Sequence, residues 1–268
     1  MIRDITIGQY YAVDSPIHRL DPRVKLMGTL LYIVGLFLAK GVVGYLLGGL
    51  FLALVIYLSK VPFRYMVRGL KAVVLLLLLS VSFNIFLTKG TPILQITKNI
   101  AITWEGLRMA VRMAVRLVML IIGSTIMTLT TTPNDLTDGL EKGLGFLKVI
   151  KVPVHEIAMM MSIALRFIPI LIEETDKIMK AQIARGADFE SGNLIQKVKN
   201  MVPLLVPLFI SAFRRAGDLA MAMEARCYHG GEGRTKMKPL IYKKQDYAAY
   251  GILVLFLFCM LGLRQLGI

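Results

Sequence analysis

Four long stretches of this chain contain no charged side chain, and these stretches constrain its fold more than any other feature. They are Gly41–Leu58, Val73–Thr88, Leu117–Thr132 and Tyr247–Leu263. A helix needs about 20 apolar residues to cross the roughly 30 Å hydrocarbon core of a bilayer. The chain is 56% apolar and 18% charged, whereas a soluble domain carries about 25% charged residues. The sequence therefore predicts an integral membrane protein and excludes a soluble enzyme.

The predicted fold class is all-α: a polytopic integral membrane protein of about five transmembrane helices with a cytosolic coupling region of three helices. The expected spans are Arg23–Ala39, Gly41–Leu58, Lys71–Thr88, a long helix that begins near Thr103, and Tyr247–Leu263. Residues 1–129 then form an N-terminal membrane domain of four spans, residues 130–246 the cytosolic coupling region with two long helices, and residues 247–268 the C-terminal membrane helix. The polar first 21 residues do not look like a cleavable signal peptide. The two cysteines, Cys227 and Cys259, cannot make a disulfide framework.

Basic residues indicate the orientation, because Lys and Arg resist translocation. With the N-terminus inside, the short inner segments 1–25 and 59–70 hold seven basic residues and the outer segments hold five. This predicts a cytosolic N-terminus and coupling region and an outer C-terminus. The net charge of +15 is dispersed along the membrane flanks, so the lipid bilayer is the expected partner and no nucleic acid is.

One basic cluster does not fit a simple span. Arg108, Arg112 and Arg116 recur every fourth residue, forming a stripe along about 12 Å of one helix face. A bare stripe in lipid is costly, so it should face other helices or water. A solvated helix start and an anion or partner contact both explain it.

The segment from residue 130 to 246 has strong helical patterning. It predicts a short helix at Asp135–Leu147 and two long ones at Val154–Arg185 and Leu194–Arg226. The long helices are apolar around much of their circumference and charged towards their C-terminal ends, so they must pack on each other, on the membrane face or on another protein. The run Met159-Met160-Met161 supports a partner surface, because thioether side chains repack easily, but ordinary core filling explains it too.

Both long helices end in a similar way. Ala184-Arg185-Gly186 closes the first and Ala225-Arg226-Cys227 closes the second. A cation in the last turn complements the helix dipole, which accounts for either arginine alone. The alternative is that each guanidinium inserts into an acidic groove of another protein, beside a small residue that lets the backbone approach.

Together with the N-terminal segment, these paired ends resemble the transmembrane T component of energy-coupling factor (ECF) transporters. The resemblance extends to Ile7-Gly8-Gln9-Tyr10, the stretch from Asp14 to Leu26, Thr131-Thr132-Pro133 and Ala222-Met223-Glu224-Ala225-Arg226. It covers nearly the whole chain and implies a non-enzymatic scaffold in a prokaryotic plasma membrane. Such a scaffold links two ABC-type ATPase subunits to one small membrane-embedded substrate-binding subunit, for uptake of vitamins or metal ions.

The resemblance also implies roles for particular residues. Arg185 and Arg226 match the two positions of the family that contact the ATPases, with Ala184, Gly186, Ala225 and Cys227 beside them. Cys227 departs from the family pattern, which more often has Gly there, and this puts close approach of that backbone in doubt. Residues Met159, Met160, Met161, Leu204 and Leu208 are expected to contact the substrate-binding subunit.

Two other classes of protein are weighed against this interpretation. Asn134-Asp135-Leu136-Thr137-Asp138 matches the pattern with which membrane prenyltransferases bind magnesium and diphosphate, but Asp135 also suits the first turn of a helix. A self-contained permease usually shows two similar halves and ionisable sites at the bilayer midplane, and neither is apparent. The sequence has no phosphate-binding loop, so ATP hydrolysis is expected in a partner. No cofactor or metal is expected, since His18, His155 and His229 lack the spacing of metal ligands.

Overall fold

The computed structural model describes residues 10–88, 91–97, 100–189, 193–231, 237 and 239–266. Contacts divide the chain into two compact units. The bundle unit comprises residues 8–139 and 240–268, and the helix-pair unit comprises residues 140–239. Each unit is described by itself below.

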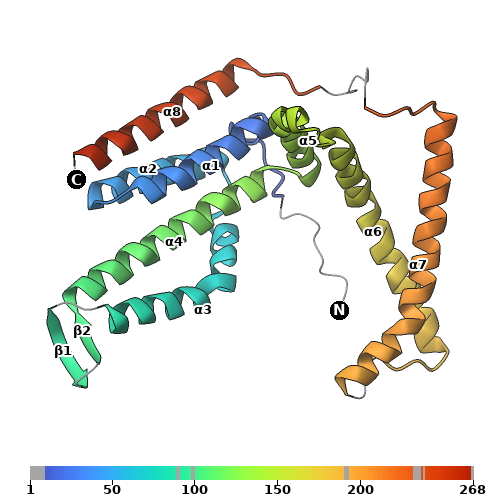
Figure 1. Cartoon of the computed structure of the whole chain (residues 1–268), viewed down its shortest axis with the longest axis horizontal. Helices are drawn as coiled ribbons and strands as arrows, with labels where there is room; N and C mark the ends of the chain where they lie inside the picture. Colours follow the sequence, from blue (N-terminus) through green and yellow to red (C-terminus); the bar gives the residue numbers. More distant parts are fainter. Residues whose placement is uncertain are drawn as a thin grey trace. The chain divides into compact units, whose positions relative to one another are not determined.

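The bundle unit contains most of the helices (Figure 1). Its elements are α1 (Pro22–Leu38), α2 (Val42–Ser59), α3 (Phe63–Leu87), β1 (Pro92–Thr97), β2 (Ile100–Thr103), α4 (Trp104–Thr130) and α8 (Lys244–Gln265). A further helix, α5 (Pro133–Gly143), crosses the boundary between the two units in the sequence. The predicted all-α class is confirmed, because one short strand pair is the only non-helical regular element among the described residues.

The core of the bundle unit forms around α1. Tyr32 and Leu36 of α1 are 4% and 0% exposed, and they pack with Phe256 of α8 and Ile126 of α4 in one apolar cluster. The rings of Phe51 and Phe256 stack with centroids 4.5 Å apart, a geometry that adds about 0.5–1.5 kcal/mol to simple burial. Helices from both ends of the sequence are thus joined through α1.

Close helix contact in this core depends on glycine. A Cβ added at Gly35 would lie 2.8 Å from the Phe256 ring, and one added at Gly123 would lie 2.7 Å from the Tyr32 ring. Both distances are below what carbon atoms tolerate. The two glycines therefore let α8 and α4 approach α1 closely.

The strand pair was not predicted from the sequence. β1 and β2 pair antiparallel, with Pro92 opposite Thr103 and Thr97 opposite Ile100, in the segment between α3 and α4. α4 begins directly after β2, where the Thr103 hydroxyl accepts a hydrogen bond from the Gly106 amide at 3.1 Å. The sequence does not indicate this strand pair because the segment is short and lies between two long apolar runs.

The set of candidate spans differs in part from the predicted one. Among the described residues α2, α4, α6 and α8 are long and apolar enough to cross a membrane, and α3, bent by 62°, makes a fifth if its two halves form one span. α1 has only 17 residues, or about 25 Å. α6, expected in the cytosol, passes the same test of length and composition.

The helix-pair unit consists of two long helices preceded by a short one. η1 (Leu144–Ile150), a 3-10 helix, leads into α6 (Val154–Ala184), and α7 (Leu194–Ala225) follows. The bounds of α6 and α7 agree with the predicted helices to within one residue. The predicted helix Asp135–Leu147 instead begins at Pro133 and gives way to η1 after Gly143. Thr132 caps the start of α5: its hydroxyl accepts a hydrogen bond from the Asp135 amide and donates one to the Asp135 carboxylate.

Candidate functional site: two arginine-capped helix ends

The end of α6 is closed by a complete Schellman motif around Arg185. The Ala187 amide donates to the Gln182 carbonyl at 3.0 Å, and the Gly186 amide donates to the Ile183 carbonyl at 2.9 Å. Gly186 takes a left-handed φ of +88°, which glycine adopts without steric cost. Arg185 is therefore the C-cap residue of α6, in a turn that is held by backbone hydrogen bonds.

The end of α7 repeats this geometry around Arg226. The Tyr228 amide donates to the Met223 carbonyl at 3.1 Å, and the Cys227 amide donates to the Glu224 carbonyl at 2.9 Å. Cys227 occupies the position of Gly186 with a φ of +54°. A side chain at a left-handed position costs roughly 1–2 kcal/mol. Cys227 thus keeps the cap but at an energetic cost.

Both arginine side chains are available to a partner. All six residues of the two ends, Ala184, Arg185, Gly186, Ala225, Arg226 and Cys227, are exposed. The cap bonds already use carbonyls of the last turn, so the guanidinium groups are not needed to satisfy them. Each planar guanidinium can form a two-pronged bond with a carboxylate, and the small alanine before it leaves room for close approach.

The two ends point in opposite directions because α6 and α7 cross antiparallel (Figure 1). The Glu174 carboxylate accepts hydrogen bonds from the Ser211 hydroxyl and, at 2.7 Å, from the Arg215 guanidinium. Nearer the loop between the helices, the Asn200 amide donates to the Asp188 carbonyl at 2.8 Å. Each motif arginine is eleven residues beyond this ion pair, or about 16 Å along its helix.

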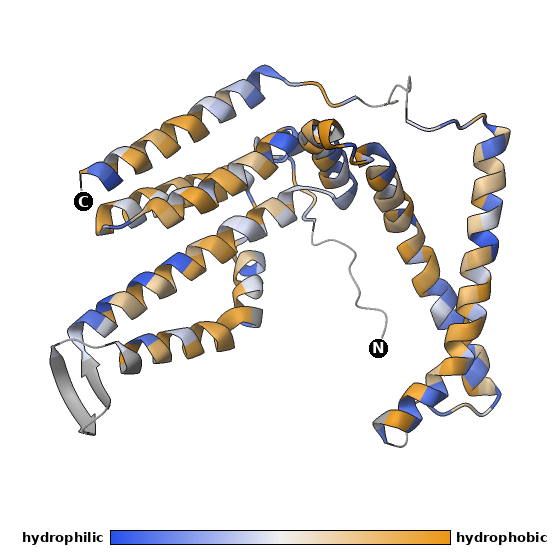
Figure 2. Ribbon diagram, in the orientation of Figure 1, coloured by the Kyte–Doolittle hydropathy of each residue, from blue (hydrophilic) through white to orange (hydrophobic). Residues whose placement is uncertain are grey.

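The residues expected to contact a membrane partner differ in their exposure. Met160 and Met161 are 58% and 41% exposed and Met159 is half-buried. Leu208 is also half-buried, while Leu204 is 4% exposed and so packs inside its own unit. The neighbours of Leu204 on α7 are more exposed than it is: Leu205, Val206, Phe209, Ile210 and Phe213. Figure 2 shows this apolar character along the first part of α7.

Comparisons with known proteins decide the family. The family model described as "Cobalt transport protein" (CbiQ) matches residues 14–237. The energy-coupling factor transporter transmembrane protein EcfT of Clostridium kluyveri is 58% identical over 250 residues, 93% of each chain. That of Acidaminococcus fermentans is 51% identical over 270 residues, covering 100% of this chain and 99% of its own. That of Bacillus subtilis is 47% identical over 246 residues, 92% and 93% of the two chains.

The chain belongs to the EcfT family. It is the transmembrane component of an energy-coupling factor transporter, a multi-pass membrane protein and a non-catalytic subunit of that complex. The prenyltransferase alternative is thereby set aside, and Asp135 caps α5 as described above. In the described part of the chain no three His, Cys, Asp or Glu side chains gather closely enough to hold a metal ion.

The N-terminal segment that resembles the EcfT family has a structural role. The Asp21 side chain caps α1 by accepting from the Arg23 amide at 2.9 Å and pairs with the Arg23 guanidinium at 2.8 Å. The Asp21 amide donates at 2.8 Å to Asp246, which caps α8 and is 1% exposed. The Arg23 guanidinium also stacks 3.8 Å above the Tyr242 ring. These bonds join the start of α1 to the start of α8.

A second group of bonds joins the same segment to the end of α4. The Lys25 ammonium donates to the carbonyls of His18, at 3.0 Å, and Thr130, at 2.8 Å. The His18 imidazole lies between the Ser15 hydroxyl, 2.7 Å from Nδ1, and the Tyr11 carbonyl, 3.0 Å from Nε2. Burial lowers the pKa of His18, because the charged form loses its hydration. The segment is therefore a junction of helix ends.

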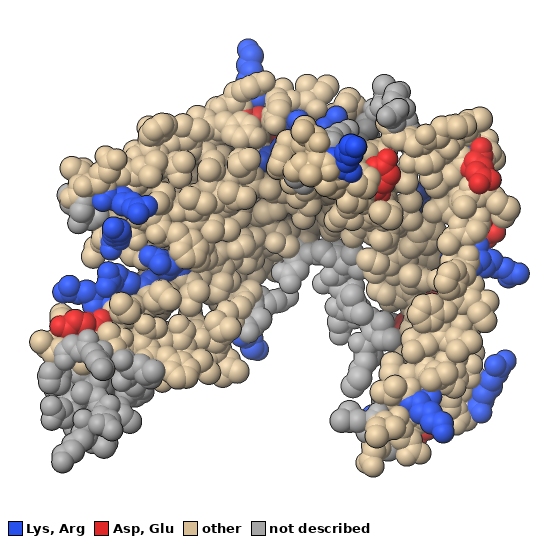
Figure 3. Space-filling view, viewed as in Figure 1, with Lys and Arg blue, Asp and Glu red and all other residues tan. Residues whose placement is uncertain are grey.

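The arginine stripe divides into an inner and an outer part. The Arg116 guanidinium donates to the Tyr45 hydroxyl at 2.6 Å and to the Ala39 carbonyl at 3.2 Å, so it braces the turn between α1 and α2. Arg108 and Arg112 are exposed. Figure 3 shows basic side chains gathered over the part of the bundle unit where α4 begins. For Arg116 the structure favours the contact with other helices over the solvated start.

Sequence reasoning missed the partners of several charged residues in this EcfT-family chain. No local pattern in the sequence indicates that Glu174 binds Ser211 and Arg215 across the helix pair. The cap of α6 could have been found from the sequence, since Gly186 marks a left-handed C′ position. Cys227 gives no such signal, because non-glycine residues rarely adopt that conformation.

Proposed function

We propose that this subunit transmits conformational change between two ATPase subunits, one bound at Arg185 and one at Arg226, and a membrane-embedded substrate-binding subunit. The transporter would thereby take up a vitamin or a metal ion. The observation that carries the proposal is the repeated cap: two exposed arginines in the same turn geometry close the opposite ends of one antiparallel helix pair.

The opposite directions of the two ends suit a paired motor. Two like arginines on antiparallel helices are related by an approximate two-fold rotation, and two like ATPases in a pair are related in the same way. Each ATPase can then offer an equivalent acidic groove to one arginine. When the pair closes or opens, the distance between its two grooves changes, and the helix pair moves with it.

The apolar residues of the pair supply the other contact. Met160, Met161, Phe209, Ile210 and Phe213 are exposed large apolar residues. A group of exposed large apolar residues is typical of an interface with a protein or a membrane. We infer that the substrate-binding subunit rests on this surface, which explains how motion of the ATPases reaches a substrate site within the membrane.

The topology of the chain in the membrane follows from this function. The N-terminus and the helix pair lie in the cytosol of a prokaryotic cell, where the ATPases have access to ATP. α6 then lies against the cytosolic face of the membrane and its partner subunit, although its length and composition would allow a span. Glu173, Glu174, Asp176, Lys177 and Lys180 in its second half support this placement, because charges within a span are costly.

A double charge reversal tests the proposal. Arg185→Glu with Arg226→Glu should abolish co-purification of the ATPases and uptake, while the chain stays in the membrane. Arg214→Glu is the matched control, because Arg214 is an exposed arginine of α7 outside the cap, and it should retain the ATPases. Normal assembly of the double variant would overturn the assignment of both ends. A pull-down with stoichiometry should give two ATPase chains and one small membrane protein.

A further inference from the structure

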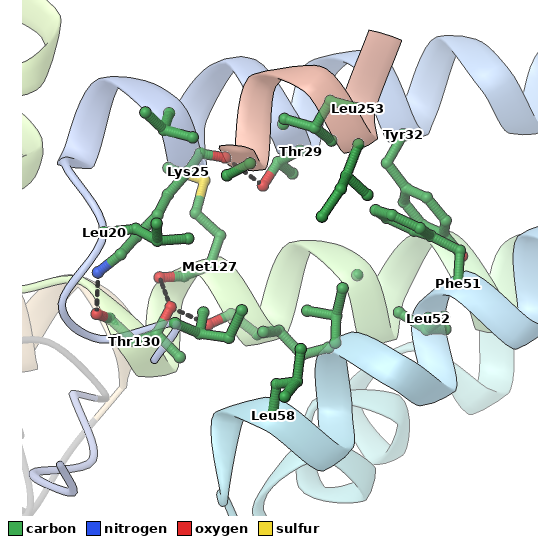
Figure 4. Close-up of a pocket in the computed structure, with 18 of the residues that line it drawn as sticks. Leu20, Lys25, Thr29, Tyr32, Phe51, Leu52, Leu58, Met127, Thr130 and Leu253 are labelled. Carbon is green, nitrogen blue, oxygen red and sulfur yellow. Dashed lines mark hydrogen bonds between the residues drawn. The ribbon is translucent and has the colours of Figure 1, made fainter. Parts of the chain in front are cut away.

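The helices of the bundle unit leave an apolar cavity of about 160 Å³ unfilled. α1, α2, α4 and α8 all contribute to its wall, with Tyr32, Phe51, Met127 and Leu253 among the lining residues (Figure 4). Atoms that face an empty space lose dispersion contacts. Apolar cavities accept apolar molecules.

The cavity opens to the surface of the bundle unit between α2 and α8. Leu54, Leu58 and Ile252 line it and are also 50%, 36% and 52% exposed. A second hollow shares Leu54, Ile252 and Phe51 with it and extends along α8 to Cys259. The two hollows form one crevice, which we call the α2–α8 crevice. From Ala249 to Cys259 it follows eleven residues of α8, whose ten rises span about 15 Å.

The positively charged side chain of Lys25 lies at one end of the α2–α8 crevice. The stem of Lys25 lines the cavity, and its ammonium bonds the Thr130 carbonyl at the far end from Phe51 (Figure 4). Its other bond partner, the His18 carbonyl, is also neutral. Among the described residues no carboxylate oxygen forms an ion pair with it. An ammonium has three donors, so one N–H remains for an additional acceptor.

The nearby carboxylates are engaged elsewhere. Asp21 forms an ion pair with Arg23. The Asp246 carboxylate accepts hydrogen bonds from the backbone amides of Asp21 and Lys243. The Asp135 carboxylate accepts a hydrogen bond from the Thr132 hydroxyl. Their presence disfavours a ligand with several negative charges at this point. A ligand with a single negative charge can still contact Lys25.

We propose that the α2–α8 crevice binds one anionic phospholipid of the bilayer, with an acyl chain along the crevice and the phosphodiester at Lys25. The length supports this occupant: about 15 Å is half of the roughly 30 Å hydrocarbon core, which is one leaflet. Lys25 lies in the first turn of α1, at the level where a headgroup meets the hydrocarbon.

Cross-linking to a photoreactive lipid tests the proposal. The full-length chain is placed in nanodiscs that contain phosphatidylglycerol with a diazirine in its acyl chain, and the labelled peptides are mapped by mass spectrometry. Labels are expected on the α2 and α8 peptides that carry Leu54 and Ile252. Ala249→Phe fills the cavity and should reduce this labelling about tenfold. Ala248→Phe is the control, because Ala248 is exposed on the same helix and lies outside the lining.

The headgroup is tested with a second pair of variants. Lys25→Gln keeps hydrogen-bond donors but removes the charge, so the preference for phosphatidylglycerol over the matching phosphatidylcholine probe should fall about tenfold. Lys71→Gln, at an exposed lysine of α3, should keep the preference. Equal labelling of Ala249→Phe and Ala248→Phe, or equal labelling of the unaltered chain by both lipids, would overturn the proposal. If Lys25→Gln does not fold, the alanine pair and the comparison of lipids decide it.

Discussion

The Glu174 carboxylate and the Arg215 guanidinium form an ion pair 2.7 Å long across α6 and α7. Glu174 lies eleven residues before Arg185, and Arg215 lies eleven residues before Arg226. Equivalent positions of the two helices therefore meet each other, which is the arrangement expected at a local two-fold axis. The pair lies at the crossing, and each arginine cap lies about 16 Å beyond it along its helix.

Reversing one member of this pair should disturb the crossing. The Arg215 and Glu174 side chains are 39% and 21% exposed, so solvent screens the pair, and we expect its removal to cost at most about 1 kcal/mol. Glu174→Arg should cost more, because two like charges then meet. The thermal unfolding midpoint of the purified chain should fall by a few degrees. Uptake by the assembled transporter should fall with it.

The exchanged pair is the decisive control for this prediction. Glu174→Arg combined with Arg215→Glu restores opposite charges but removes the bond from the Ser211 hydroxyl, so the unfolding midpoint and uptake should both recover in part. A double variant as impaired as the single one would show that the register does not depend on this pair. Glu173→Arg, one residue away on α6, should have a smaller effect on both measurements.

Cys227 should be improved by glycine. Its φ of +54° is disfavoured for any side chain, so Cys227→Gly should stabilise the end of α7 by about 1 kcal/mol. Ala222→Gly, inside the same helix, should instead destabilise it by about 0.5–1 kcal/mol. Hydrogen exchange of the last turn of α7 measures both effects. Slower exchange in Cys227→Gly and faster exchange in Ala222→Gly are expected, and the same sign in both would contradict the cap geometry.

The sequence predicted long helices well, because their signals are local. The bounds of α6 follow from Pro153 before its start and Gly186 after its end, and both α6 and α7 show apolar periodicity between their ends. The paired arginine ends were likewise identified as candidates from short motifs. The exposed positions of these residues agree with a role in binding a partner protein.

Contacts between distant residues could not be predicted. The Asp21 amide and the Asp246 carboxylate are 225 positions apart, and no pattern near either one indicates the other. The bracing of the α1–α2 turn by Arg116 is of the same kind. α6 shows a further limit: apolar content alone does not distinguish a helix that crosses the membrane from one that lies on a partner.

Gly231 should not tolerate alanine. A Cβ there would lie 2.3 Å from Cδ2 of His155, and the imidazole is held by Glu141, whose carboxylate is 2.8 Å from Nδ1. Overpacking of this kind costs about 1–3 kcal/mol, so Gly231→Ala should lower the unfolding midpoint of the chain. Gly217→Ala is the control, since its Cβ meets no described atom within 4 Å and alanine favours a helix. It should raise the midpoint slightly, and a fall in both variants would contradict the contact.

Acid should weaken the junction around His18. Burial keeps its pKa below the ordinary 6.5, and the charge of Lys25 lowers it further, while bonding to the Tyr11 carbonyl and the charge of Asp14 act in the opposite direction. Near pH 6.5 the unfolded chain therefore binds a proton at His18, whereas the folded chain does not. The contribution of His18 to the free energy of unfolding is complete above this pH and falls as the pH drops below it. Thermal unfolding between pH 7.5 and 5 should show this loss. His18→Gln should flatten the part of the slope that His18 causes, whereas His229→Gln, at an exposed histidine, should leave it. An unchanged slope in His18→Gln would assign the acid sensitivity to other groups.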